Sequence, residues 1–326
     1  MNMYWSVYEN LETEVLALAD SIMFDDSQLK VYSLKIGDLL VRCAVEIEAI
    51  SKELYLQEGG QFSVYDKNGD KRDLYFDTDC LDLLVKKWNI NKKKLHVSSL
   101  KMDFSSSHLI LTPLEKSNQR GKCQWKKAYQ AIKHNRATSL KQANIRNLLN
   151  ALGALYILNL YHRNESFWCN VPIHDKMPYA NPSKIFIPYV CDITDDITLL
   201  LPCRDESKEL LLMQKMNESV YVKRYMKESV KEKRKIILIL LESLKSSSMS
   251  LSDWADEFAS VFPSNSFQEL SNNPKLVKWI SNFNKLSLPE KKIIPQMGAT
   301  AKEIVLNKNL SIFPEESFEE FLNLNG

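Results

Sequence analysis

The sequence predicts a mostly α-helical protein, in which a helical bundle carries a small β-hairpin and an irregular insertion and is followed by a helical C-terminal extension. Apolar residues recur at spacings of three and four along several segments, which is the period of one helix face. Glycine accounts for only 8 of 326 residues, which argues against a turn-rich β fold. The apolar fraction of 44% is enough for a chain of this length to bury a sizeable core.

Two amphipathic helices are expected first, over residues 4–22 and 32–56. The first is expected to end at the Asp-Asp-Ser cluster of residues 25–27. The second carries one apolar stripe along its length, and Arg42 and Glu46 recur along one border of that stripe. These two charges would therefore be partly shielded by the element against which the stripe packs.

A hairpin and a third helix are expected next. The pair Asn68-Gly69 separates two short β-prone runs, and such a pair favours a tight hairpin turn. The run TDCLDLLVKKW then predicts a short helix at 78–88. Its N-cap residue is expected to be Thr78 or Asp79, because either side chain can accept a backbone hydrogen bond.

The middle of the chain combines an irregular segment with helices. Residues 92–124 show no helical period and include β-prone pieces such as HLILT. A helix is then expected from about Gln124 to Asn135. A new helix is expected to begin at Ser139, since Gln142 three residues later completes a capping-box pattern.

A buried helix is expected over residues 148–161, which are apolar nearly all round. Gly153 lies in this helix between alanines and would allow a neighbouring helix to approach closely. Residues 165–204 hold five of the eleven prolines and show few periodic signals. They are expected to form an ordered loop or a small β element.

A shift in composition near residue 204 divides the chain into two expected domains. Residues 1–204 would form the helical bundle, and residues 205–326 would form the helical extension. The strongest helix of the extension is expected near 227–246, with two shorter helices after it.

Charge and targeting patterns indicate a cytoplasmic protein with no membrane partner. The 43 Lys and Arg residues nearly balance the 41 Asp and Glu residues, so any site for a polyanion must be a local patch. No basic segment followed by an apolar stretch opens the chain, and no run of 18 apolar residues occurs in it. The six cysteines show no two-residue spacing, which favours reduced thiols in the cytoplasm.

Metal binding is one candidate function for the cysteines and histidines between residues 162 and 203. These are His162, Cys169, His174, Cys191 and Cys203. Zinc sites usually contain closely spaced ligand pairs, and this segment has none. No metal and no cofactor is therefore expected, and buried thiols with loop histidines are the simpler interpretation.

A basic stripe in VKRYMKESVKEKRK, residues 222–235, is a second candidate site. Its cations could follow a phosphate backbone, with each contact releasing counterions. The candidate nucleic-acid-binding residues are Lys223, Arg224, Lys227, Lys231 and Arg234. The alternative is a solvated helix face, which Lys and Glu commonly form when they alternate at helical spacing.

A third candidate is the segment AYQAIKHNRATS, hereafter the 128–139 cluster. Lys133, His134 and Arg136 fall within four residues of a chain with five histidines. An imidazole can transfer protons near neutral pH and a guanidinium can bind a phosphoryl oxygen, as cleavage of RNA by its own 2′-hydroxyl requires. The alternative is that these cations only offset the negative end of a helix macrodipole.

Geometry limits how the 128–139 cluster could work. On an ideal helix, Tyr129 and Arg136 share one face while His134 points to the other side. Joint action of His134 and Arg136 therefore requires the helix to end at the cluster, or a second chain to complete the site.

Three segments together show a resemblance to a known superfamily. They are YSLKIGDLLVRCAVEIEAISKEL, WKKAYQAIKHNR and QANIRNLLNALGALYIL. Residues 5–165 resemble the HEPN superfamily (higher eukaryotes and prokaryotes nucleotide-binding domains), in particular bacterial proteins with a Trp, Tyr, Lys-His and Arg signature. The resemblance implies a helical bundle, often dimeric, and many members are metal-independent ribonucleases of toxin-antitoxin or antiphage systems.

The resemblance also implies roles for individual residues. By position, His134 would be the general acid or base and Arg136 the phosphate clamp, with Lys133 and Tyr129 in support. Arg42 and Glu46 would be neighbours across the bundle. The usual motif of the superfamily, an Arg followed four to six residues later by His, is not present, because Arg136 comes after His134.

Two hypotheses about function follow. The first is a HEPN-like protein, expected to be a homodimer, that binds or cleaves RNA as a candidate metal-independent endoribonuclease of a toxin or antiphage defence system. The second is a non-catalytic interaction module, in which the 128–139 cluster ends a helix and the C-terminal helices bind a protein partner.

Overall fold

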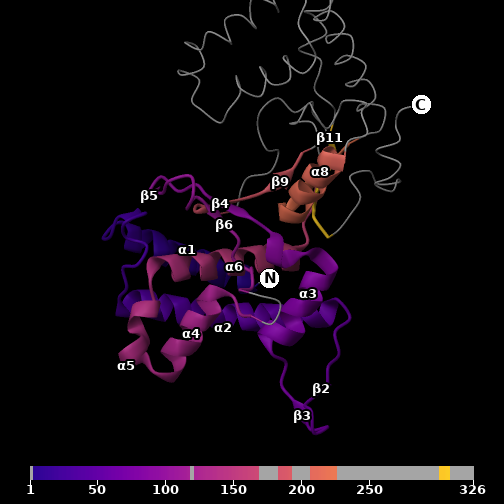
Figure 1. Ribbon diagram of the computed structural model, residues 1–326. Helices are drawn as coiled ribbons and strands as arrows, with labels where there is room; N and C mark the ends of the chain where they lie inside the picture. Colours follow the sequence, from indigo (N-terminus) through magenta and orange to yellow (C-terminus); the bar gives the residue numbers. More distant parts are fainter. Residues whose placement is uncertain (1–2, 118–120, 169–182, 193–205, 226–300, 309–326) are drawn as a thin grey trace, which may run out of the picture.

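The structure, a computed structural model, describes residues 3–117, 121–168, 183–192, 206–225 and 301–308. Helices are the main element of these ranges, so a mostly α fold is confirmed for them. Figure 1 shows most of the helices gathered in one body. The hairpin projects from one end of that body, and the small sheets lie at the other (Figure 1).

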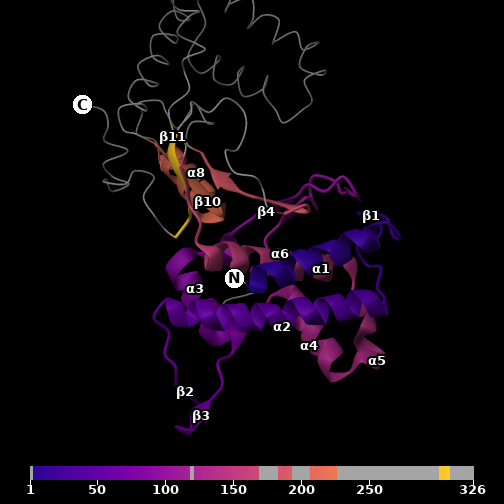
Figure 2. The ribbon, with the colours of Figure 1, turned by 180° about the vertical axis from the view of Figure 1, so that it is seen from behind.

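Two long helices form the centre of the body, α2 (Leu34–Gln57) and α6 (Ile145–Arg163). They pack on each other, and α1 (Met3–Ala19) packs on both, as Figures 1 and 2 show. The hydroxyl of Ser33 caps α2 by accepting a hydrogen bond from the Ile36 amide at 3.1 Å. The two helices expected at the start of the chain are therefore confirmed.

Helix α6 is the buried helix that the apolar pattern predicts. Every residue from Leu148 to Tyr161 is buried except Asn150, which is partly exposed. The helix begins under a local cap, since the side chain of Asn144 accepts a hydrogen bond from the Asn147 amide at 3.0 Å. Burial on all sides follows from the elements that cover it, which are helices on one side and short strands on the other.

Gly153 does allow a close approach, but the expected neighbour is wrong. A Cβ added at Gly153 would lie 3.0 Å from Pro113 Cγ and 3.2 Å from Leu95 Cδ1. The close neighbours are therefore a loop and a strand, and not a second helix. The sequence pattern shows that a small residue is needed there, but it does not show which distant segment packs on it.

Replacing Gly153 by alanine is expected to lower the free energy of unfolding by about 1–3 kcal/mol, because the added methyl group would overpack this contact. Gly37→Ala in α2 is the matched control, since the nearest side-chain atoms to its Cβ lie at 3.4 Å, an ordinary contact. Both variants gain the same helix propensity, on the order of 1 kcal/mol. Urea unfolding of the two proteins checks the prediction, and equal free energies of unfolding would contradict it.

The predicted hairpin is confirmed. Strands β2 (Val64–Tyr65) and β3 (Lys71–Arg72) pair in antiparallel orientation. Gly69 in the turn has φ = 86°, a conformation that glycine adopts without strain.

The third expected helix is present as α3 (Leu81–Trp88), but its predicted N-cap is wrong. A π-helical turn, η1 (Phe76–Cys80), precedes α3 and contains both Thr78 and Asp79. The carboxylate of Asp79 accepts instead from the Arg72 guanidinium at 2.7 Å and ties the hairpin to this turn. The local sequence pattern could not show that Arg72 of the hairpin would bind the Asp79 carboxylate.

The segment around the 128–139 cluster is broken into short elements. Helix α4 (Gln124–His134) confirms the expected helix and ends at the cluster. The new helix expected from Ser139 is wrong, because α5 (Arg136–Ser139) and a 3₁₀ turn, η3 (Leu140–Gln142), come first. Ser139 makes no capping hydrogen bond.

Short strands cover the side of α6 that the other helices leave open. In one sheet, β4 (Leu95–Val97) pairs in antiparallel orientation with β6 (Ile110–Leu111) and with β8 (Phe186–Pro188). Separately, β1 (Phe24–Asp25) pairs in parallel with β5 (Met102–Asp103). These pairings bring the loop after β1 close to the loop after β5.

A second sheet has the strand order β7-β11-β10-β9. Its strands are β7 (Phe167–Trp168), β9 (Val190–Cys191), β10 (Tyr221–Tyr225) and β11 (Ala301–Leu306). Helix α8 (Glu206–Glu218) lies between β9 and β10 in the sequence.

This sheet bears on three expectations for the C-terminal part. A small β element within 165–204 is confirmed for the described residues. Strands from both sides of the expected boundary at residue 204 share the sheet. The solvated helix face considered for the basic stripe is wrong at 222–225, which belong to strand β10. The helix expected near 227–246 lies outside the described residues.

Candidate functional site

The 128–139 cluster lies at the surface. Lys133, His134 and Arg136 are all exposed. The Arg136 guanidinium donates to the Asp38 carboxylate of α2 at 2.9 Å, and the Lys133 ammonium lies 5.7 Å from the centre of the Tyr129 ring. Because α4 ends at His134, the two expected catalytic side chains are not fixed on opposite faces of one helix.

The expected neighbours of His134 face a different helix. The Arg42 guanidinium binds the Glu14 carboxylate of α1. Glu46 also acts on α1, since it contributes to a raised pKa of Tyr4, for which burial is the main cause. Among the described residues, neither Arg42 nor Glu46 forms a hydrogen bond or an ion pair with the 128–139 cluster.

The basic stripe is partly neutralised. In β10, the Lys223 ammonium binds the carboxylate of Asp192, and the Arg224 guanidinium donates to Glu303 Oε1 at 2.8 Å. The side chains of Lys223 and Arg224 are only 13% and 15% exposed. A phosphate could reach these two cations only by displacing their carboxylates, and their role in binding nucleic acid stays a prediction. The other members, Lys227, Lys231 and Arg234, lie outside the described residues.

No group of His, Cys, Asp or Glu within the described ranges is placed to hold a metal ion. Of the residues considered for zinc, His162 lies with Nε2 3.1 Å from Glu53 Oε2, and Cys191 is buried. Cys169, His174 and Cys203 lie outside the described residues. None of the helices that the structure describes is long and apolar enough to cross a membrane.

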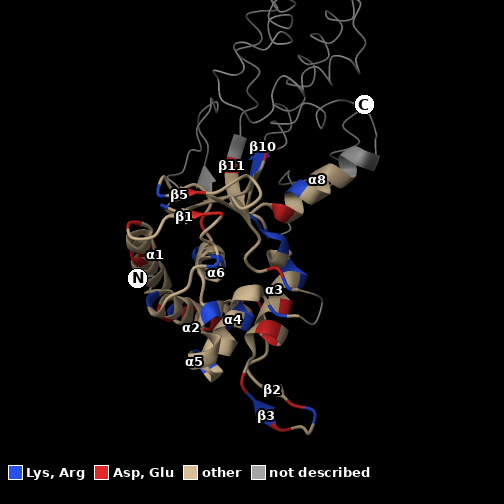
Figure 3. Ribbon diagram, turned by 60° about the vertical axis from the view of Figure 1, so that its left-hand side comes forward, with Lys and Arg blue, Asp and Glu red and all other residues tan. Residues whose placement is uncertain are grey.

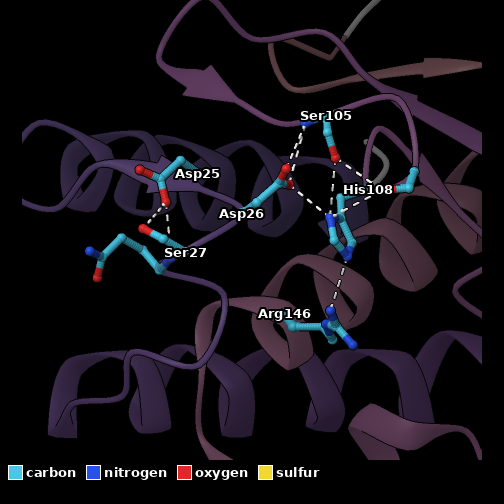
Figure 4. A network of polar contacts seen from close by, with 8 residues as sticks. Asp25, Asp26, Ser27, Ser105, His108 and Arg146 are labelled. Atoms are coloured by element: carbon cyan, nitrogen blue, oxygen red, sulfur yellow. Dashed lines mark hydrogen bonds and ion pairs between the residues drawn. The ribbon is translucent and has the colours of Figure 1, made fainter.

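A polar network that the sequence did not indicate joins three distant parts of the chain: Asp26 after β1, His108 after β5, and Arg146 in the first turn of α6 (Figure 4). His108 Nδ1 lies 2.8 Å from Asp26 Oδ1. On the other side of the ring, Arg146 Nη2 lies 3.2 Å from His108 Nε2. We call these three residues the Asp26–His108–Arg146 network.

Hydrogen bonds in the local turns orient Asp26 and the loop that carries His108. Asp25 closes the turn after β1 by accepting from the Gln28 amide at 2.9 Å, and the next carboxylate, Asp26, points toward Ser105 and His108 (Figure 4). The Ser105 amide donates to Asp26 at 3.1 Å and holds the loop that carries His108. Hydrogen bonding by Ser105, and then by His108, lowers the pKa of Asp26 below its usual range.

The start of α6 is held in the same way. The amides of Ile145 and Arg146 donate to the carbonyls of Val31 and Leu29, each at 3.1 Å. These bonds join α6 to the segment that follows β1. The Arg146 side chain is therefore presented from a fixed helix to the loops that carry Asp26 and His108.

The contacts determine which nitrogen of His108 carries the proton. A guanidinium can only donate, so Nε2 must accept the hydrogen bond from Arg146. The proton of the neutral ring is then on Nδ1, where it is donated to the Asp26 carboxylate. The result is an imidazole oriented by a carboxylate, with its basic Nε2 beside a cation, which is the arrangement of a general base next to an anion-binding group.

The network opens onto a cavity of about 270 Å³. Leu29, Phe104 and Leu149 form part of its apolar wall, and His108 and Arg146 lie at its edge. No residue of the 128–139 cluster lines this cavity. Figure 3 shows Lys and Arg interspersed with Asp and Glu along the described elements.

Comparison with known proteins assigns no family to the chain: no protein-family model, no curated protein and no solved structure matches it.

Proposed function

We propose that the protein binds RNA and cleaves it without a metal ion, and that the reacting groups belong to the Asp26–His108–Arg146 network. The observation that carries the proposal is the pair of contacts on the His108 ring, to Asp26 at 2.8 Å and to Arg146 at 3.2 Å, beside a cavity. RNA as the substrate, a homodimeric state and a role in defence are carried over from the resemblance of residues 5–165 to the HEPN superfamily.

The network can supply the base and the phosphate-binding cation that the reaction needs. An RNA phosphate entering the cavity would attract Arg146, whose N–H groups would move from the imidazole to the phosphate oxygens. His108 Nε2 would then be free to accept the proton of the 2′-hydroxyl. Attack of O2′ on phosphorus forms one bond and breaks the bond to O5′, which takes a proton from water. The hydroxide that is left takes the proton held by His108, which returns the imidazole to its neutral form. The products are a 2′,3′-cyclic phosphate and a 5′-hydroxyl.

The 128–139 cluster is less suited to this chemistry. The Arg136 guanidinium is paired with the Asp38 carboxylate, which a phosphate would have to displace before it could bind. Among the described residues, His134 has no hydrogen-bond partner, so no carboxylate fixes its tautomer or its orientation. We therefore assign the proton transfer to His108 in place of His134.

Incubation of the purified protein with single-stranded RNA in excess EDTA tests the proposal. Cleavage is expected to continue in EDTA and to leave 2′,3′-cyclic phosphate ends, which mass spectrometry identifies. An RNA with 2′-deoxy sugars at every position is expected to remain intact, because the attacking hydroxyl is missing. Cleavage of that control, or cleavage only with a divalent cation, would exclude the mechanism.

The second candidate function is the non-catalytic interaction module, which the local contacts of the 128–139 cluster favour. Asn135 Oδ1 accepts from the Thr138 amide at 3.3 Å and caps α5, while Arg136 pairs with Asp38. The cluster thus joins two short helices to α2. If the folded wild-type protein neither binds nor cleaves any RNA that is tested, the result would support the interaction module over the ribonuclease.

A further inference from the structure

Recognition of one base is a further function that the same cavity can perform. A volume of about 270 Å³ is near the lower end of the range for small-ligand sites, which is the size class of a single nucleotide. Apolar walls on such a cavity can cover the faces of a base, while polar groups at the rim recognise its edge. The polar groups at the cavity therefore determine which base is bound.

Asn150 presents an acceptor to the cavity. It lies four residues after Arg146 on α6, so the two side chains share one face of that helix. Its Nδ2 donates to the carbonyl of Arg146 at 2.9 Å. The amide nitrogen gives one of its two hydrogens to the backbone, so Oδ1 and one N–H remain for a ligand, and the oxygen can only accept.

Glu115 presents a second acceptor. It follows β6, lines the cavity and is exposed. Among the described residues its carboxylate has no ion pair and no hydrogen bond, in contrast to the Asp26 carboxylate, which contacts His108. An ionised carboxylate offers two oxygens that accept and none that donates.

A free carboxylate is unfavourable in a site for RNA unless the ligand compensates for it. Glu115 repels the phosphate that Arg146 attracts, so it lowers affinity for nucleic acid in general. It raises affinity only for a ligand that donates hydrogen bonds to it. Such a combination of repulsion and specific attraction is how a binding site gains selectivity.

Guanine is the base whose edge matches these acceptors. Its N1–H and its N2 amino group are neighbouring donors, so one carboxylate can accept from both in parallel. Adenine and cytosine offer an amino group next to an acceptor nitrogen, and uracil offers one N–H between two carbonyl oxygens. For these three bases a carboxylate would face at least one oxygen or nitrogen lone pair.

We propose that this cavity binds guanine, with Glu115 accepting from N1–H and the N2 amino group and with Asn150 Oδ1 as a supporting acceptor. The inference rests on the proposed function and names its substrate, which is RNA with guanosine on the 5′ side of the cleaved bond. The scissile phosphate would then lie toward His108 and Arg146.

Four oligonucleotides that carry a single ribonucleotide, G, A, U or C, in an otherwise 2′-O-methyl strand test the proposal. The wild-type protein is expected to cleave the G substrate at least about tenfold faster than the others under single-turnover conditions. Glu115→Gln is expected to remove this preference and to raise relative cleavage at A, because a side-chain amide can pair with the amino group and ring nitrogen of adenine. Glu9→Gln, an exposed carboxylate on α1 that lies away from the cavity, is the matched control and should leave the preference unchanged.

The outcomes separate this inference from the proposed function. Equal cleavage of all four substrates would overturn guanine recognition while leaving the ribonuclease proposal in place. Cleavage of none would overturn the ribonuclease proposal. Guanine binding is then tested without catalysis, by calorimetric titration with guanosine 3′-monophosphate and adenosine 3′-monophosphate. Tighter binding of the guanosine nucleotide that Glu115→Gln removes would support recognition, and equal affinities would overturn it.

Discussion

His108→Ala is expected to lower the rate of RNA cleavage by about 10²–10⁴-fold, which is the usual contribution of a positioned general base. The side chain is 36% exposed and belongs to a loop, so its removal leaves the buried core intact and should change the melting temperature little. Cleavage is measured under single-turnover conditions in EDTA. Cleavage at the wild-type rate by this variant would exclude His108 as the reacting group.

Two further variants test whether cleavage depends on the orientation of His108 by Asp26. Asp26→Asn is expected to slow cleavage by at least about tenfold, because an amide group that donates toward Nδ1 would favour the wrong tautomer of His108. His134→Ala is the matched control, since it removes an exposed imidazole of the same kind that has no hydrogen-bond partner among the described residues. Cleavage by this control should match the wild-type rate.

Lys93→Met is expected to raise the free energy of unfolding, on the order of 3–5 kcal/mol at pH 6. Lys93 is fully buried, and its ammonium nitrogen has no hydrogen-bond partner. Burial lowers the pKa of Lys93 to about 7, with a small opposing effect from Cys191 and a small lowering effect from Lys92. A methionine of similar length would fill the same space without a group that requires solvation.

The pH dependence of this effect has a definite sign. In the unfolded chain the pKa of Lys93 returns toward the ordinary value of 10.5, so between about pH 7 and 10.5 the unfolded state binds the additional proton. The free energy of unfolding of the wild-type protein should therefore increase with pH across that window, by up to about 1.4 kcal/mol per pH unit from this group. Below pH 7 the lysine is charged in both states and the penalty of burying it is complete.

Urea unfolding at pH 6, 8 and 10 measures this dependence. The difference between Lys93→Met and the wild-type protein should be largest at pH 6 and should shrink toward pH 10. Lys92→Met is the control, because Lys92 is the exposed neighbour and its replacement should change stability little at any of these pH values. A Lys93→Met protein that is less stable than the wild type at pH 6 would refute the prediction.

The elements that sequence reasoning predicted correctly are those with a strong local pattern. The apolar stripe of α2 and the continuous apolar run of α6 can each be recognised within about 20 residues. The errors arise where distant contacts decide the structure. Lys223 and Arg224 resemble a helix face, but pairing with β9 and β11 makes them part of a strand. Gly153 indicates a close approach without revealing that Pro113 and Leu95 make it.

The same limit explains why the sequence did not indicate the Asp26–His108–Arg146 network. His134 and Arg136 attract attention because they are adjacent in the sequence, whereas Asp26, His108 and Arg146 are separated by 82 and 38 residues and meet only in the fold. Weak signals for the network do exist. Residues 25–27 have the composition of a helix end, and the Ser-Ser-Ser-His stretch at 105–108 lies in a segment without a helical period. No periodic pattern connects these segments, so the sequence could not show that they meet.

The central claim is that an RNA phosphate binds beside His108 and not at the 128–139 cluster. The most direct test is an NMR titration of the five histidine side chains with a 2′-O-methyl RNA that contains guanosine and cannot be cleaved. The imidazole signals of His108 are predicted to shift as the RNA binds, while those of His134 stay in place. A shift of the His134 signals with those of His108 unchanged would contradict the account.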